Sequence, residues 1–162
     1  MKAIKALALD VDGVLTDGTV WWSASGEELK RFCFADITGI PLAKKAGILL
    51  CLISGESSPS GMKLVDRFAE KLGITDVYRG CHDKAAALNE FAAKHNIRLS
   101  SVCFMGDDVN DLTALKRAGL SVAPASAHAT VRRQVDLVTR QRGGHGAVRE
   151  LIDKLIAHQK KK

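Results

Sequence analysis

The sequence ALALDVDGVLTDG, residues 6–18, changes abruptly from an apolar run to a segment rich in aspartate and glycine. Apolar residues extend back to Ile4, and a run of this length predicts a buried strand over residues 4–9. Asp10 and Asp12 follow the run, and side chains two positions apart in an extended segment share a face. The stretch therefore predicts a strand with two carboxylates at its carboxyl end.

The pattern of a short apolar run followed by polar residues recurs along the chain. Such runs cover residues 48–53, 77–78 and 102–105, and two candidates for edge strands cover 121–123 and 136–138. Segments of helical period lie between the runs, at residues 39–46, 61–72, 84–95, 108–118 and 146–158. This alternation predicts βαβ units around a central parallel sheet, which is an α/β fold.

Length and composition limit the architecture and the location. The 162 residues, 46% hydrophobic and 26% charged, predict one folded domain over residues 1–162 and exclude a second large domain. No apolar stretch approaches the ~20 residues of a membrane span, and residues 1–10 lack a secretory signal, so we expect a cytoplasmic protein with no membrane partner. The four cysteines are scattered singly, which argues against a disulfide scaffold and a CxxC zinc site.

The net charge of +6 favours an anionic partner. Nucleic acid is one such class, but the chain lacks a recognition helix and an aromatic-basic platform, and an acidic site would repel a phosphate backbone. We therefore expect a small anionic substrate and no nucleic acid. The lysines at 160–162 are expected to form a solvated tail.

One segment, about residues 18–34, interrupts the alternation. Residues 19–24 and 27–34 both resemble strands, and Ser25-Gly26 between them favours a hairpin turn. Trp21, Trp22, Phe32 and Phe34 would lie on this ribbon, where exposed aromatic faces favour a partner. We predict self-association through the hairpin; packing of the ribbon on its own domain is the alternative.

Polar residues at the ends of the predicted strands suggest a phosphoryl-transfer site. Ligands of open α/β sheets bind at the carboxyl ends of strands. Carboxylates from two different strands repel each other unless a cation lies between them, and all-oxygen ligation suits Mg²⁺. Asp10 and Asp107 are therefore the candidate metal ligands, whereas Asp108 is equally well explained as a helix cap.

The remaining strand-end residues have matching roles. Asp10 would attack phosphorus, and Asp12 would act as the general acid and base. Ser54, the backbone at Gly55 and the Lys84 ammonium would hold the phosphoryl oxygens. Asp111 would orient metal-bound water or anchor Lys84.

These residues resemble a known family. In order and spacing, Asp10–Thr16, Ser54, Lys84 and Gly106–Asp111 are similar to the four motifs of the haloacid dehalogenase superfamily of phosphatases. Within it, residues 15–18, the hairpin and residues 142–150 look like the branch that acts on 3-deoxy-D-manno-octulosonate 8-phosphate. The resemblance covers nearly the whole chain.

The resemblance implies a Rossmann-like three-layer sandwich without a cap domain, and a homotetramer whose hairpins assemble so that neighbouring subunits close the active site. It implies a cytoplasmic Mg²⁺-dependent phosphatase of lipopolysaccharide biosynthesis that forms an aspartyl-phosphate. By the same carry-over, the metal ligands are Asp10, Asp107 and the main-chain carbonyl of Asp12.

Two positions depart from the octulosonate pattern. Residues 35–39 read Ala-Asp-Ile-Thr-Gly, where those enzymes usually show Arg-Asp-Gly-x-Gly, and Glu56 stands where they usually place arginine. Glu56 looks more like related phosphatases of nine-carbon ulosonic acid 9-phosphates, which, with a broad-specificity phosphatase, are the alternative. Further candidate substrate contacts are Gly55, Glu56, Asp36, Arg142 and Arg149. A non-enzymatic alternative is a catalytically silent assembly module.

Overall fold

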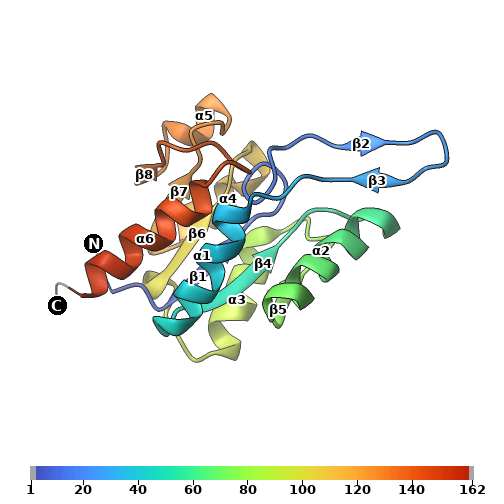
Figure 1. Ribbon diagram of the computed structural model, residues 1–162. Coiled ribbons are helices and arrows are strands. Elements are labelled where there is room, and N and C mark those ends of the chain that lie inside the picture. Colours follow the sequence, from blue (N-terminus) through green and yellow to red (C-terminus); the bar gives the residue numbers. More distant parts are fainter. Residues whose placement is uncertain (1–2, 161–162) are drawn as a thin grey trace.

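The computed structural model describes residues 3–160, so Lys161 and Lys162 of the predicted tail lie outside the described residues. Its centre is a six-stranded sheet in the order β5-β4-β1-β6-β7-β8 (Figure 1). The strands are β1 Ala6–Leu9, β4 Leu49–Ile53, β5 Asp76–Tyr78, β6 Val102–Met105, β7 Leu120–Ala123 and β8 Leu137–Val138. Every neighbouring pair is parallel, which confirms the predicted α/β fold.

The strand register brings the polar strand ends together. Leu9 at the end of β1 pairs with Leu52 of β4 on one side and with Met105 of β6 on the other. The chain segments that begin at Asp10, Ser54 and Gly106 therefore leave the sheet at the same edge.

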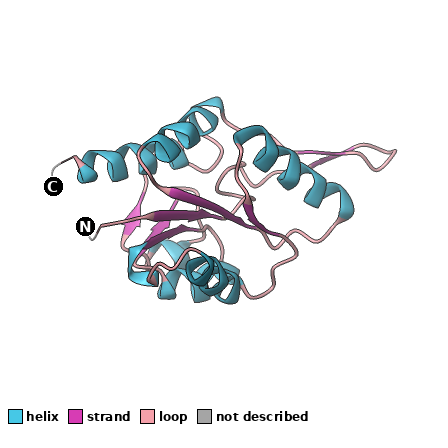
Figure 2. Cartoon of the chain, turned by 90° about the horizontal axis from the view of Figure 1, so that it is seen from below, coloured by secondary structure: helices cyan, strands magenta, loops and turns pink. Residues whose placement is uncertain are grey.

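Helices cover both faces of the sheet (Figure 2). Leu7 and Leu9 of β1 belong to one apolar core, and Ala6 and Ala8 to the other, because alternate side chains of a strand point to opposite faces. The first core is covered by α1 Phe34–Lys45, α2 Pro59–Leu72 and α6 Ala147–Gln159. The second core is covered by α3 Lys84–Lys94, α4 Leu112–Arg117 and α5 Ala129–Arg132. The three layers agree with the predicted sandwich.

Local capping fixes where the helices begin near the strand ends. Ser58 is the N-cap of α2 and its hydroxyl accepts a hydrogen bond from the Gly61 amide. Asp83 caps α3 by accepting from the amides of Ala85 and Ala86. Lys84 is thus the first residue of a capped helix, which fixes its backbone at the carboxyl edge of the sheet.

A two-stranded hairpin projects from the sandwich (Figure 1). It pairs β2 Trp21–Trp22 with β3 Glu28–Leu29, so the ladder is much shorter than the predicted strands over 19–24 and 27–34. Placing Phe34 on the ribbon was wrong, because it begins α1, and Phe32 stacks on Phe68 of α2 with ring centroids 4.4 Å apart. Trp21 and Trp22 remain 69% and 72% exposed.

Some predicted boundaries differ from the structure. α1 begins five residues before the predicted Gly39. It packs closely on α6, since a Cβ at Gly39 would lie 3.1 Å from Arg149 Cδ. β7 is an inner strand and not an edge, since β8 pairs with it. α5 and the 3-10 turns η1 Leu99–Ser101 and η2 Val109–Asp111 carry weak periodicity and were not predicted separately. Among residues 3–160, no helix is long and apolar enough to cross a bilayer.

Candidate active site

A cavity of about 340 Å³ lies at the carboxyl edge of the sheet. Its walls come from the segments that follow β1, β4 and β6 and from the start of α3. The lining residues are Asp10, Asp12, Gly13, Gly18, Gly55, Glu56, Lys84, Asp107, Asp108 and Asn110. Most of the predicted strand-end residues therefore meet at one cavity.

Lys84 lies between two carboxylates at the base of this cavity. Its Nζ is 2.9 Å from Asp10 Oδ1 and 2.6 Å from Asp111 Oδ1, and its side chain is 2% exposed. Burial opposes the charge of Lys84, but Asp10 and Asp111 more than offset it, so the pKa of Lys84 is raised. The Asp10 carboxylate is further fixed by the Val11 amide, which donates to Oδ1 at 2.8 Å.

Asp10, Asp107 and Asp111 form an acidic cluster whose ligand oxygens all lie within 4.8 Å of one another. Burial, followed by repulsion from Asp111, raises the pKa of Asp107 to about 7 and that of Asp10 well above its usual range. Lys84 supplies one positive charge against three carboxylates, so the set retains excess negative charge. An oxygen-only donor set with this excess fits a hard divalent cation such as Mg²⁺.

Asp111 holds the turn that follows β6. Its Oδ2 accepts hydrogen bonds from the amides of Asp107 at 2.8 Å and Asp108 at 3.2 Å. Asp108 in turn caps η2 and forms a capping box with Asp111. Asp111 is fully buried and its other oxygen binds Lys84, so this residue anchors both Lys84 and the backbone of Asp107.

The loop after β1 depends on close glycine contacts. Gly13 has a φ of +84°, and a Cβ at this position would lie 2.0 Å from Asp107 Oδ2. A Cβ at Gly143 would lie 1.8 Å from the Gly13 carbonyl oxygen. The glycine-rich loop before α6 thus packs directly on the loop that carries Asp12.

Ser54 and Gly55 follow β4. The Ser54 side chain is buried, and its hydroxyl accepts a hydrogen bond from the Glu56 amide at 3.1 Å. A Cβ at Gly55 would lie 3.9 Å from Lys84 Cε and 4.0 Å from Asn110 Nδ2. Gly55 therefore lines the cavity beside Lys84, as a phosphate-holding backbone requires, whereas the buried Ser54 is not among the lining residues.

Two residues beside this cavity were not predicted from the sequence. Asn110 lines it from η2, and its place in the segment Gly106–Asp111 was the available signal. Lys30 follows β3, and its Nζ contacts the carboxylates of Asp12 and Glu56, which lie on two other segments of the chain. Its position two residues after Glu28, on the same strand face, was a weak signal.

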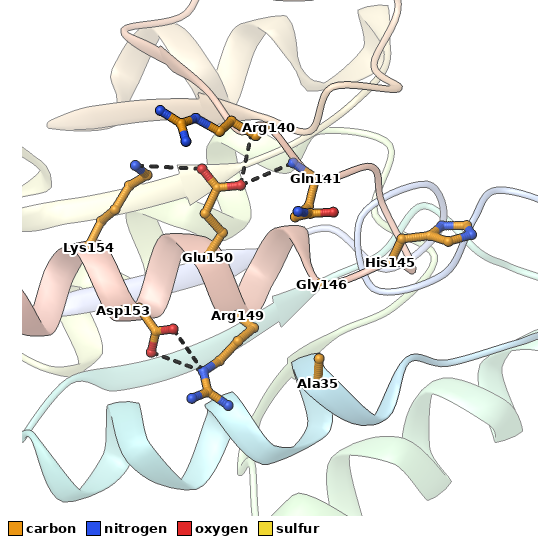
Figure 3. Close-up of a pocket in the computed structure, with 9 residues that line it drawn as sticks. All are labelled: Ala35, Arg140, Gln141, His145, Gly146, Arg149, Glu150, Asp153 and Lys154. Carbon is orange, nitrogen blue, oxygen red and sulfur yellow. Dashed lines mark hydrogen bonds and ion pairs between the residues drawn. The ribbon is translucent and has the colours of Figure 1, made fainter.

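Asp36 and Arg149, two predicted substrate contacts, lie outside the acidic cavity, where α1 meets the start of α6. Asp36 is buried, and its carboxylate accepts from the amides of Gly146 and Arg149 at the start of α6. The Arg149 side chain pairs with Asp153 and lines a cavity of about 620 Å³ formed by the first turns of α6, the segment 140–146 before it and Ala35 of α1 (Figure 3). That cavity and the acidic one share no lining residue among those described. Arg142 is exposed on the glycine-rich loop.

Comparison with known proteins shows which family has this fold and this arrangement of residues. A model of the haloacid dehalogenase-like hydrolase family matches residues 36–151. The chain belongs to the haloacid dehalogenase-like hydrolases. The 3-deoxy-D-manno-octulosonate 8-phosphate phosphatase KdsC of Escherichia coli K12 is 41% identical over 158 residues, covering 98% of this chain and 82% of the relative. The predicted resemblance to this family is thereby confirmed.

Solved structures of the same family have the same fold. The octulosonate phosphatase of Moraxella catarrhalis, in complex with magnesium, phosphate and KDO, matches with a TM-score of 0.92 and 37% identity over 98% of this chain and 88% of that one. The cobalt-bound enzyme of Haemophilus influenzae matches with a TM-score of 0.90 and 35% identity over 98% and 90%. This haloacid dehalogenase-like hydrolase therefore shares the capless fold of these phosphatases.

Proposed function

We propose that this haloacid dehalogenase-like hydrolase is a Mg²⁺-dependent phosphatase that hydrolyses 3-deoxy-D-manno-octulosonate 8-phosphate through an aspartyl-phosphate. The observation that carries the proposal is the buried contact of Lys84 with Asp10 beside the carboxylate of Asp107. A nucleophile, a cation for phosphoryl oxygens and a metal-binding carboxylate thus occupy one cavity. The identity to enzymes named for this substrate supports the choice of sugar acid.

Asp10, Asp107 and the main-chain carbonyl of Asp12 would hold Mg²⁺. When bound, the ion supplies positive charge that offsets these carboxylates and the phosphoryl oxygens. Asp111 is not needed as a ligand, because both of its oxygens already accept hydrogen bonds from protein groups. Its role is to position Lys84 and the Asp107 turn.

The chain's own residues account for both chemical steps. A carboxylate oxygen of Asp10 attacks phosphorus as the bond to the sugar oxygen breaks, and Asp12 gives that oxygen its proton. Asp12 then takes a proton from water, whose oxygen attacks phosphorus and releases phosphate and Asp10. Lys84 and the backbone at Gly55 hold the phosphoryl oxygens throughout.

Glu56 favours a second candidate substrate. It lines the cavity where octulosonate enzymes usually carry arginine. Its oxygens each accept one hydrogen bond, from Lys30 and from the Ser58 amide, and a carboxylate oxygen with one donor has a second acceptor site for a sugar hydroxyl. The phosphatases of nine-carbon ulosonic acid 9-phosphates, which Glu56 resembles, are therefore the alternative.

Self-association through the hairpin is part of the proposal. Trp21, Trp22 and Leu29 are 65% or more exposed on a ribbon that extends from the sandwich, and such a surface favours burial against another copy. A homotetramer would bring neighbouring subunits to a cavity that this fold leaves without a cap.

Phosphate release from both sugar-acid phosphates, measured for the wild type and for Asp10→Asn, tests the proposal. We expect wild-type activity that requires Mg²⁺ and no turnover by Asp10→Asn, with an unchanged circular dichroism spectrum. Asp153→Asn, which alters an exposed carboxylate, is the control and should keep full activity. Turnover by Asp10→Asn would refute the assignment of Asp10 as the nucleophile. An inactive wild type would favour a catalytically silent assembly module.

A further inference from the structure

Lys30 forms an unusual buried contact with three carboxylates. Its Nζ lies 2.8 Å from Glu56 Oε2, 3.0 Å from Asp12 Oδ1 and 3.2 Å from Glu28 Oε1. The Lys30 side chain is 4% exposed, although its backbone belongs to the projecting hairpin. An almost fully buried ammonium at this place requires an explanation.

The donors of Lys30 are fully used. A lysine ammonium has three N–H donors, and three carboxylates surround this one. Burial opposes the charge of Lys30, but its hydrogen bonds to Glu56, Asp12 and Glu28 raise its pKa, so the group stays charged. No donor remains for a phosphate or a substrate carboxylate, so Lys30 acts on its protein partners.

The three partners belong to three separate segments that meet at Lys30, and two of them, Asp12 and Glu56, line the reaction cavity. Asp12 lies on the loop after β1, Glu28 on β3, and Glu56 on the loop after β4. A second hollow of about 420 Å³, lined in part by Trp22 and Lys30, shares Asp12, Gly18 and Glu56 with the reaction cavity. This hollow adjoins Asp12, where the leaving group of a phosphate ester would lie.

Asp12 needs such a partner. Its side chain is 39% exposed at the mouth of the cavity, where an unrestrained carboxylate would sample several rotamers. Lys30 contacts both of its oxygens, Oδ1 at 3.0 Å and Oδ2 at 3.1 Å, and so fixes the direction of the group. Glu56 is fixed from two sides, since its Oε2 contacts Lys30 and its Oε1 accepts from the Ser58 amide at 2.9 Å.

We propose that Lys30 is a positioning residue of the reaction, which holds Asp12 toward the leaving-group oxygen and links the placement of the hairpin to the reaction cavity. The proposal rests on the role of Asp12 in the proposed function. Proton donation to a poor leaving group requires a well-placed acid, whereas a good leaving group departs without one. Loss of Lys30 should therefore act selectively on poor leaving groups.

The test compares Lys30→Met with wild type on phenyl phosphate and p-nitrophenyl phosphate, which are similar in shape and differ in leaving-group basicity. The measured quantity is kcat/KM, because it reports the step in which the leaving group departs. We expect a loss of at least ~10-fold for phenyl phosphate and for the sugar-acid phosphate, and a loss below ~3-fold for p-nitrophenyl phosphate. Lys71→Met, on the exposed face of α2, is the matched control.

Equal losses on both aryl esters, or no loss on either, would overturn the proposal, because a general structural defect does not depend on the leaving group. If Lys30→Met fails to fold, Glu28→Gln carries the test, since it loosens Lys30 without altering Asp12 or Glu56. Glu28→Gln should show the same selectivity with a smaller loss of kcat/KM. An equal change of kcat/KM on both aryl phosphates would refute the proposal. Wild-type inactivity on all three esters would instead count against the proposed function.

Discussion

Nζ of Lys84 lies 2.9 Å from Oδ1 of Asp10, and both side chains are buried at the end of the central strand. The contact is formed because β1 and α3 both reach the carboxyl edge of the sheet, where Asp83 caps α3 immediately before Lys84. Asp111 completes the arrangement by binding the same ammonium at 2.6 Å. The fold therefore holds the proposed nucleophile Asp10, the proposed phosphate-binding Lys84 and the supporting Asp111 in mutual contact.

Replacement of Lys84 by methionine should abolish turnover and destabilise the protein. Methionine preserves the apolar stem but leaves Asp10 and Asp111 without their buried cation, and breaking a buried pair costs about 3–5 kcal/mol. Urea unfolding and phosphate-release assays would measure both effects. Lys154→Met is the control, because the exposed Lys154 side chain makes only a 3.5 Å contact with Glu150 and its replacement should cost at most about 1 kcal/mol.

The Gly13→Ala variant should lose activity through Asp107, the proposed metal ligand. Alanine at a φ of +84° costs about 1–2 kcal/mol, and its Cβ would displace the Asp107 carboxylate. Gly47→Ala is a matched control, because Gly47 has a φ of +75° and a methyl group added there would meet no described atom within 4 Å. We expect both variants to pay the cost of alanine at a positive φ, and Gly13→Ala to lose more stability because Asp107 must move. Only Gly13→Ala should lose about tenfold or more in kcat/KM and need more Mg²⁺. Equal activities would contradict this role of Gly13.

The residues that sequence patterns predict well are those whose placement follows from the sheet alone. Asp10, Asp12, Lys84 and Asp107 each follow a strand or begin a helix, so parallel pairing brings them together whatever the loops do. Lys30 could not be placed in this way, since its partners lie on three segments joined only by tertiary packing. Asp36 likewise looked like a substrate contact, yet in the protomer it caps α6, a role that only the packing of α1 on α6 reveals.

The length of the hairpin was overestimated for a related reason. Its β-branched and aromatic residues favour extended backbone over 19–34, but only Trp21–Trp22 and Glu28–Leu29 pair as strands. Beyond the ladder, Phe32 stacks on Phe68 and Phe34 begins α1, so contacts with the sandwich take over. Local propensity could not reveal where those contacts begin.

Glu56→Gln should change stability in a pH-dependent way. Burial opposes the charge of Glu56, but Lys30 and the Ser58 amide lower its pKa from 4.5 to about 2. A carboxylate whose pKa is lowered by folding adds stability that is fully present above about pH 4.5 and is lost as the pH falls toward 2. The stability gap between wild type and Glu56→Gln should therefore be constant near neutral pH and narrow below pH 4.5, as urea unfolding would measure.

A matched control for this prediction is Glu70→Gln, which removes an exposed glutamate of α2 that lies outside the Lys30 network. A gap between wild type and Glu56→Gln that stays constant down to low pH would contradict the ion pair between Glu56 and Lys30. The measurement is made without Mg²⁺, so that metal release at low pH does not contribute.

Joint replacement of Trp21 and Trp22 by glutamate should dissociate the assembly that we propose. Both side chains are about 70% exposed, so their loss should change the stability of a protomer by less than about 0.5 kcal/mol. Buried in an interface, the same glutamates would place four or more charges against apolar partners, and association would fail. Sedimentation velocity should therefore show a tetramer for wild type and a smaller species for the variant. Phe34→Glu changes an equally exposed aromatic residue outside the hairpin and should keep the wild-type size. A monomeric wild type, or a variant that still assembles, would show that the hairpin tryptophans do not join the subunits.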